Sequence, residues 1–113
     1  MNDKTIEFDV GSGNVYADLD FPDADEMLVK AQLAAKIGEI IKAHRWSQQK
    51  AAEMVGLTQP KLSSLLRGQF RGISEAKMFD CLTRLGRDVR IVVGPPRRDA
   101  TAGRVAVAFN RGR

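Results

Sequence analysis

Residues 47–68 read SQQKAAEMVGLTQPKLSSLLRG, and this stretch predicts two short helices joined by a tight turn. Ser47 is a good N-cap for the first helix, because its hydroxyl can accept a hydrogen bond from a free amide of the first turn. Gly56 tolerates a positive φ, which lets the chain leave one helix and enter another within about three to four residues. Thr58 is placed to cap the second helix. Pro60 falls in the first turn of that helix, where a missing N–H has no cost.

The apolar residues of this stretch recur at helical spacing, so one side of each helix is expected to pack on a common core. They are Ala52, Leu57, Leu62 and Leu65. The outward side of the second helix is polar and consists of Thr58, Gln59, Lys61, Ser63 and Ser64. An ordinary α-hairpin also exposes polar faces, so the polarity alone leaves that alternative open.

The positions of these residues resemble the helix-turn-helix of the Cro and phage-repressor (XRE) type. Ala52 stands where the two helices would approach closely, Gly56 follows at the turn, and Leu62 and Leu65 occupy the buried sites of the second helix. The resemblance implies a mainly α, lambda-repressor-like helical bundle in which residues 59–67 form the recognition helix. The N-terminal residues of such a helix meet base edges in the major groove of DNA.

The chain has 113 residues, which predicts one domain with a modest core. Its net charge is +4, but the charge is unevenly distributed. Residues 1–27 carry eight acids and one lysine (−7), residues 28–93 carry twelve bases and five acids (+7), and residues 94–113 carry five arginines and one acid (+4). A basic middle and a basic tail suit a polyanionic partner.

Cysteine and histidine are too few for several kinds of site. The single cysteine, Cys81, excludes an internal disulfide and a cysteine-rich zinc site, and with one histidine no metal cluster and no cofactor are expected. We see no phosphate-binding glycine loop and no spaced carboxylate and histidine set, so an enzyme is not expected. No apolar run approaches the roughly 18 residues of a membrane span, and no signal peptide is evident, so a cytoplasmic location is expected.

Residues 1–22 form an acidic N-terminal arm with two short apolar stretches, 5–10 and 15–19. The first alternates apolar and polar residues, as a half-exposed strand does. An arm of this composition is equally compatible with disorder until a partner orders it.

A long first helix is predicted from residue 23 to about His44, with Asp23 as its cap and acids in its first turn. The lysines Lys30, Lys36 and Lys42 are expected on outward faces. The inward face is predicted from the spacing of Leu28, Ala31, Ala34 or Ala35, Ile37 or Gly38, and Ile41. His44 is explained by packing and by the helix dipole, and Trp46 is expected to cover one end of the core.

After the second short helix comes a basic loop, residues 68–72. In this kind of fold such a loop runs beside the DNA backbone, so Arg67 and Arg71 are assigned to phosphate contacts, with solvated arginines as the alternative. A further helix is predicted to open at a Ser74 cap and to end at Gly86. Met78, Phe79, Leu82 and Leu85 are its predicted inward residues, with Cys81 semi-buried beside them.

Residues 87–93 have the β-branched density of a strand. A single strand after a helical bundle needs a hydrogen-bonding partner. We expect it to pair with the same strand of a second subunit through Val89, Ile91 and Val93; an N-terminal strand or residues 104–109 are the alternative partners. The predicted organisation is then an arm (1–22), a helix-turn-helix DNA-binding domain with its strand (23–93) and a basic tail (94–113).

Residues 13–19, 30–34, 59–68 and 85–93 together resemble a subfamily of small XRE-type regulators, over about residues 13–95. Its members are typically antitoxins of type II toxin–antitoxin modules (HigA-like), paired with a toxin of the RelE/HigB class. The resemblance implies a homodimeric repressor that binds a palindromic operator in double-stranded DNA at its own promoter and sequesters a small basic toxin. The acidic arm, residues 1–22, is then expected to contribute to toxin binding.

The same resemblance assigns DNA-binding roles by position. Gln48, with Gln49 beside it, would anchor the first helix to a phosphate, and Gln59 would read a base, since a glutamine amide can bond bidentately to adenine. The remaining DNA contacts would come from Thr58, Lys61, Ser63 and Ser64. Pro60 stands where many relatives carry a polar side chain, so part of the specificity is expected to come from DNA shape. A stand-alone regulator without a toxin, and an adaptor that binds only protein, remain as alternatives.

Overall fold

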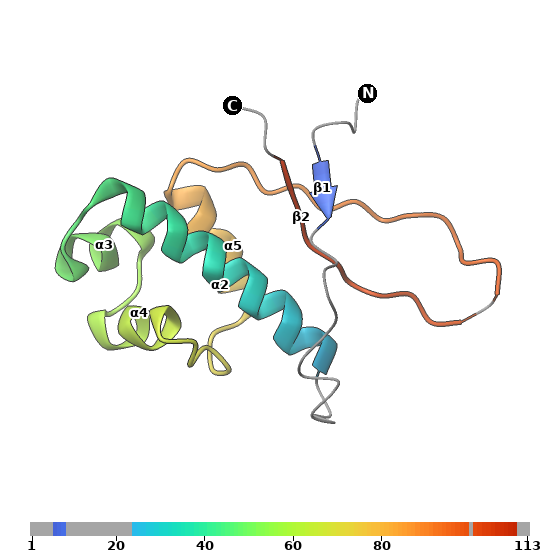
Figure 1. Ribbon diagram of the computed structural model, residues 1–113, viewed down its shortest axis with the longest axis horizontal. Coiled ribbons are helices and arrows are strands. Elements are labelled where there is room, and N and C mark those ends of the chain that lie inside the picture. The colour runs from blue at the N-terminus through green and yellow to red at the C-terminus, as the bar shows by residue number, and fades with distance from the viewer. Residues whose placement is uncertain (1–5, 9–23, 100, 111–113) are drawn as a thin grey trace. The chain divides into compact units, whose positions relative to one another are not determined.

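The computed structural model describes residues 6–8, 24–99 and 101–110, and it is mainly helical (Figure 1). Its elements, in chain order, are β1 (Ile6–Phe8), α2 (Ala24–His44), α3 (Gln48–Val55), α4 (Gln59–Leu66), α5 (Glu75–Arg84) and β2 (Ala108–Asn110). The chain divides into two compact units, residues 30–94 on the one hand and residues 1–29 with 95–113 on the other. The mainly α fold with a helix-turn-helix is therefore confirmed.

Each short helix of the first unit begins at a hydroxyl cap. Ser47, Thr58 and Ser74 have extended backbones, and each side-chain oxygen accepts a hydrogen bond from the amide three residues later. Such caps satisfy amides that the first turn leaves without a helical partner. All three predicted caps are confirmed, and they fix where the helices begin.

The core of the helical unit takes side chains from all four helices. The largest fully buried side chains are Ile37 of α2, Val55 of α3, Leu62 and Leu65 of α4, and Met78 and Cys81 of α5. Cys81, expected to be semi-buried, is completely buried, and burial raises the pKa of its thiol above the usual value. The predicted inward leucines of the second short helix are confirmed.

The inward face of α2 differs in part from the prediction. Leu28 and Ala31 are only partly buried, whereas Leu33 and Ile40 are buried. Lys30, expected on an outward face, is 5% exposed. Lys30 lies four and seven residues before Ala34 and Ile37 and therefore shares their helical stripe. The expectation that Lys30 faces outward was therefore wrong.

Helix α5 buries a narrower face than expected. Met78 and Leu82 are buried as predicted, but Phe79 and Leu85 are only partly buried. The helix ends at the Leu85 cap, and Gly86 follows with a φ of 84°. The predicted end of this helix at Gly86 is thus confirmed.

The second unit contains a two-stranded antiparallel sheet. Strand β1 pairs with β2, and Glu7 lies opposite Phe109 in the register. A strand within the predicted stretch 5–10 is therefore confirmed. The other predicted strand of the arm, residues 15–19, lies outside the described residues, as does most of the arm itself.

The C-terminal strand is present at Ala108–Asn110, not at residues 87–93. Residues 87–93 form no strand within the single chain, and residues 88–96 make no backbone hydrogen bond within the described part of the chain. The two segments considered as alternative partners for residues 87–93 pair with each other instead. A strand cannot exist without a partner ladder, so β-branched density alone could not place it here.

None of the described helices combines the length and the hydropathy that a membrane-spanning helix requires.

Candidate DNA interface

The turn between α3 and α4 has the backbone that the sequence predicts. Gly56 closes α3 with φ 76° and ψ 30°, and its amide donates to the carbonyl of Ala52 at 2.9 Å. The amide of Leu57 donates to the same carbonyl at 3.1 Å, and Leu57 is buried. A left-handed residue followed by a buried leucine is a common way to end a helix. This geometry redirects the chain, so that Thr58, the N-cap of α4, follows two residues after Gly56.

Helix α4 presents its first turn to solvent. Thr58 Oγ1 accepts a hydrogen bond from the amide of Lys61 at 3.3 Å, and Pro60 lies in the first turn. The side chains of Gln59 and Lys61 are exposed and make no hydrogen bond or ion pair with any other described residue. Because Leu62 and Leu65 fix α4 in the core, this exposed polar turn is held in place while its donors and acceptors remain available.

The N-terminus of α3 is similarly exposed. Gln48 and Gln49 are exposed, and Ser47 Oγ accepts from the amide of Lys50 at 3.1 Å. The N-terminal amides of a helix carry a partial positive charge that favours a nearby anion such as a phosphate. His44 and Trp46, just before this helix, stack with ring centroids 4.1 Å apart and planes at 3°.

Arg67 and Arg71 differ in the hydrogen bonds that they make. Arg67 Nη1 donates to Ser63 Oγ, and Nη2 donates to Gln69 Oε1 at 3.4 Å, so this guanidinium lies along the end of α4. Arg71 is exposed, and its carbonyl accepts a hydrogen bond from Lys30 Nζ at 2.9 Å. The Arg67 side chain is therefore held along the end of α4, whereas at Arg71 the group that Lys30 bonds is the backbone carbonyl.

The loop after α4 is anchored from inside the helical unit. Phe70 and Ile73 are buried, and the amide of Gln69 donates to the carbonyl of Ser64 at 2.8 Å. Lys30 is the single charged side chain that is buried among the described residues. Burying an ammonium is costly unless hydrogen bonds compensate it, so the bond from Lys30 to the loop carbonyl explains its place.

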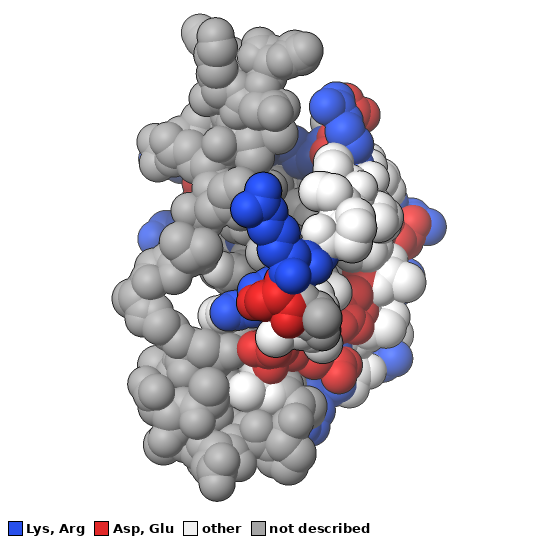
Figure 2. Space-filling model, turned by 90° about the vertical axis from the view of Figure 1, so that its right-hand side faces the viewer, with Lys and Arg blue, Asp and Glu red and all other residues white. Residues whose placement is uncertain are grey.

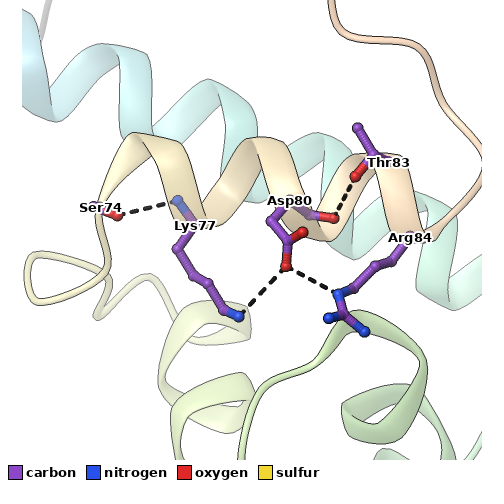
Figure 3. Close-up of polar contacts among 5 residues, drawn as sticks. All are labelled: Ser74, Lys77, Asp80, Thr83 and Arg84. Atoms are coloured by element: carbon purple, nitrogen blue, oxygen red, sulfur yellow. Dashed lines mark hydrogen bonds and ion pairs between the residues drawn. The ribbon is translucent and has the colours of Figure 1, made fainter.

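Helix α5 carries a polar cluster next to the helix-turn-helix (Figure 3). Asp80 Oδ2 accepts from Arg84 Nε at 2.9 Å and lies 3.5 Å from Lys77 Nζ. The hydrogen bond from Arg84, together with the charges of Arg84 and Lys77, holds the pKa of Asp80 below its usual value. Thr83 Oγ1 donates to the carbonyl of Asp80 at 2.9 Å.

An open, mostly apolar groove of about 680 Å³ runs along α2 beside the end of α4. Small residues of α2, including Ala31 and Gly38, form one wall, and Leu66 and Phe70 form part of the other. A Cβ on Gly38 would stand 3.3 Å from Leu66 Cδ2, so this glycine allows the two helices to approach closely. Lys42 and Arg45 also line the groove.

Charge supports the surface formed by α3, α4 and the loop as the DNA-facing side. Residues 47–71 carry four basic residues, Lys50, Lys61, Arg67 and Arg71, against one acid, Glu53. By contrast, the face drawn in Figure 2 shows Lys and Arg side chains interspersed with Asp and Glu. An excess of positive charge beside an exposed polar helix is what a polyanionic duplex requires.

The structure places the predicted DNA-binding residues in three neighbouring segments. Gln48 and Gln49 lie at the start of α3, the group from Thr58 to Ser64 on α4, and the two arginines at and after its end. Two polar residues that shape this surface, Lys30 and Arg84, were missed. The helical stripe could have indicated Lys30, but nothing in the sequence indicates that Arg84 lies against the turn between α3 and α4.

Two short capped helices joined through a left-handed glycine, the second buried on one side and polar on the other, define a helix-turn-helix domain. A family model described as a helix-turn-helix domain matches residues 15–94. A solved structure described as "Putative XRE Family Transcriptional Regulator" is 36% identical in sequence with a TM-score of 0.68, over 76% of this chain and 97% of that chain. A search of curated proteins finds no match.

The chain belongs to the XRE-type helix-turn-helix family of DNA-binding transcriptional regulators. The XRE-type helix-turn-helix expected from residues 47–68 is thereby confirmed. Members of this family typically act by binding DNA. This agrees with the expectation that the chain is a binding protein and not an enzyme.

Proposed function

We propose that the chain is a homodimeric transcriptional repressor that binds a palindromic operator at its own promoter and serves as the HigA-like antitoxin of a RelE/HigB-class toxin. The observation that carries the DNA-binding part is the first turn of α4. Gln59 and Lys61 are exposed there without partners among the described residues, on a helix fixed by two buried leucines.

In this proposal the contacts divide into two kinds. Gln59 reads a base edge in the major groove of the DNA, with Thr58 and Lys61 beside it. Ser63 and Ser64, further along α4, line the same DNA groove. Gln48 and Gln49 hold the start of α3 to a phosphate, and Arg67 and Arg71 contact the backbone at the other end. Backbone contacts of this kind set the register of the protein without reading sequence.

The dimer part of the proposal rests on residues 87–93. Ile91, Val92 and Val93 are 73%, 79% and 89% exposed, and the backbone around them makes no hydrogen bond within the described residues. Pairing with the same segment of a second copy would satisfy this backbone and would bury Val89, Ile91 and Val93 together. A two-fold axis between the copies suits an operator whose half-sites lie about 34 Å apart, one turn of B-DNA.

The antitoxin part is supported by charge alone. Residues 1–27 carry a net charge of −7, whereas the rest of the chain is basic. A toxin that binds RNA is itself basic, so an acidic segment is a suitable partner for its surface.

The first experiment compares two duplexes of about a hundred base pairs at about physiological salt: the region upstream of the gene, and a scrambled sequence of equal composition. A preference of roughly a thousandfold or more for the upstream region is expected of a specific repressor. Equal weak binding to both duplexes would contradict autoregulation.

A second experiment addresses the toxin. The product of the adjacent gene is titrated by calorimetry into the full chain and into a variant that lacks residues 1–22. Tight binding that weakens on truncation is expected; no heat with the full chain would favour a stand-alone regulator, and equal affinity of both forms would remove the arm from the interface.

A further inference from the structure

The side chain of Arg84, on helix α5, lies beside Gly56, which has no side chain of its own. A Cβ built on Gly56 would lie 2.9 Å from both Cζ and Nε of Arg84, and 3.2 Å from Nη1. The two distances of 2.9 Å are shorter than real Cβ contacts, so the guanidinium occupies the space beside the glycine. Figure 3 shows Arg84 extending from α5 toward the green ribbon of α3.

The position of the guanidinium is held from its own helix. Arg84 Nε donates to Asp80 Oδ2 at 2.9 Å, and the same oxygen lies 3.5 Å from Lys77 Nζ. A planar guanidinium fixed by a carboxylate one turn earlier has less freedom than a solvated arginine. Arg84 therefore meets the turn between α3 and α4 in a defined orientation.

The electrostatics of this contact are favourable for α3. Helix α3 has no basic residue in its own last turn. A cation near the C-terminal end of a helix interacts favourably with the helix dipole. Arg84 supplies that cation from another helix, next to the Gly56 cap of α3.

We infer that Arg84 is a positioning residue for DNA reading: held by Asp80, it fixes the turn at Gly56 and with it the angle at which α4 meets the duplex. This inference rests on the DNA-reading role proposed above for α4. It assigns no DNA contact to Arg84 itself. The role is distinct from core stability, because half of the Arg84 side chain is exposed and it lies outside the buried core.

The test uses a probe duplex that the wild-type chain enriches from a random-sequence pool, together with a scrambled version of it. Arg84→Met removes the guanidinium but keeps a long side chain. Arg98→Met is the matched control, because Arg98 is an exposed arginine outside α5 and outside residues 87–93, and the variant loses the same charge. Asp80→Asn keeps the arginine and weakens its anchor.

The expected result for Arg84→Met is a fall of at least about fivefold in the affinity ratio of enriched to scrambled duplex, the lower end of what one bidentate base contact contributes. Arg98→Met should leave the ratio unchanged, and Asp80→Asn should lower it by a smaller factor. A uniform loss of affinity for both duplexes, equal in the two Met variants, would mean that only charge matters and would overturn the inference.

A second readout does not depend on DNA. The amides of Gly56 and Leu57 both donate to the carbonyl of Ala52. In Arg84→Met their hydrogen exchange should accelerate relative to α2 amides of the same molecule, and in Arg98→Met it should not. Hydrogen exchange in Arg84→Met that matches exchange in the control variant would overturn the inference. If the wild type enriches no duplex, the proposed function fails. The exchange comparison then still decides whether Arg84 fixes the turn at Gly56.

Discussion

At the scale of single residues, Gln59 has the chemistry most suited to reading a base. Its amide offers a donor and an acceptor side by side, and it is exposed at the first turn of a helix that Thr58 caps. Because the backbone there is already ordered, only the rotamer freedom of the side chain itself is lost when it binds.

We therefore expect Gln59→Ala to cost roughly 1–3 kcal/mol on the preferred duplex and to relax the preference at one or two base positions. Binding to scrambled DNA should hardly change, because no phosphate contact is removed. Fluorescence anisotropy with a set of duplexes, each carrying one base-pair substitution, measures this directly. An equal loss on every duplex would show that Gln59 contacts the backbone instead.

Asp80 predicts a dependence of stability on pH. Its pKa in the folded chain is lowered by the Arg84 hydrogen bond and by the charges of Arg84 and Lys77. A carboxylate with a lowered folded pKa contributes stability above its unfolded pKa of about 4, and this contribution is lost as pH falls through the folded value.

Thermal unfolding of wild type and Asp80→Asn should therefore differ by a constant amount above about pH 5, with the wild type more stable, and the difference should shrink below about pH 4. Glu39→Gln is the control, since its ion-pair partner Lys36 lies three residues earlier in α2. A difference that stays constant down to the acid limit would show that the Asp80 charge does not stabilise the fold.

The caps at Ser47, Thr58 and Ser74 could be predicted from the sequence because each acts on an amide three residues away. Lys30 and Arg84 could not be placed in this way. Lys30 bonds a carbonyl 41 residues along the chain, and Arg84 lies against a glycine on another helix. Local patterns predict local hydrogen bonds, whereas contacts between helices depend on how the helices pack.

At the scale of elements, the segment of residues 87–93 has the composition of a strand and no partner within the described chain. The valines and the isoleucine of this segment indicated a strand. A strand also needs a second strand as its hydrogen-bonding partner, and the composition of the segment does not identify that partner. Helices α2 to α5 were easier to predict because each helix satisfies its own backbone.

We expect Ile91→Lys to weaken the homodimer without unfolding the chain. Ile91 is 73% exposed in the single chain, so a lysine is tolerated there, but two copies paired about a two-fold axis would bring like charges together. Sedimentation equilibrium should show the wild type as a dimer and the variant shifted toward monomer.

Val105→Lys provides the control for this substitution. Val105 is 74% exposed and lies outside residues 87–93, so its variant should keep the wild-type mass. A dimer that survives Ile91→Lys would place the interface on another surface.

At the scale of the whole molecule, folding and binding use different residues of the same short helix. Leu62 on α4 is completely buried, while Gln59 and Lys61 in its first turn are exposed. The spacing of the leucines predicted this division, because period and polarity agree along α4. Along α2 they disagree at Lys30, and there the prediction was wrong.

Leu62→Ala should destabilise the chain by about 2–5 kcal/mol, the range for a cavity left by a fully buried leucine. Leu66→Ala is the matched control, because Leu66 is 38% exposed in the same helix, and we expect it to cost less than about 1 kcal/mol. Urea unfolding at constant pH and protein concentration measures both. Similar losses for the two variants would mean that the core does not centre on Leu62.

The stack of His44 on Trp46 has a practical consequence. Trp46 is the one tryptophan of the chain, and it stands two residues before the first helix of the helix-turn-helix. Excitation of indole therefore reports from a single known place beside Gln48. The protein carries its own fluorophore at the edge of the proposed interface, so a titration with unlabelled DNA can be followed by emission without any chemical modification.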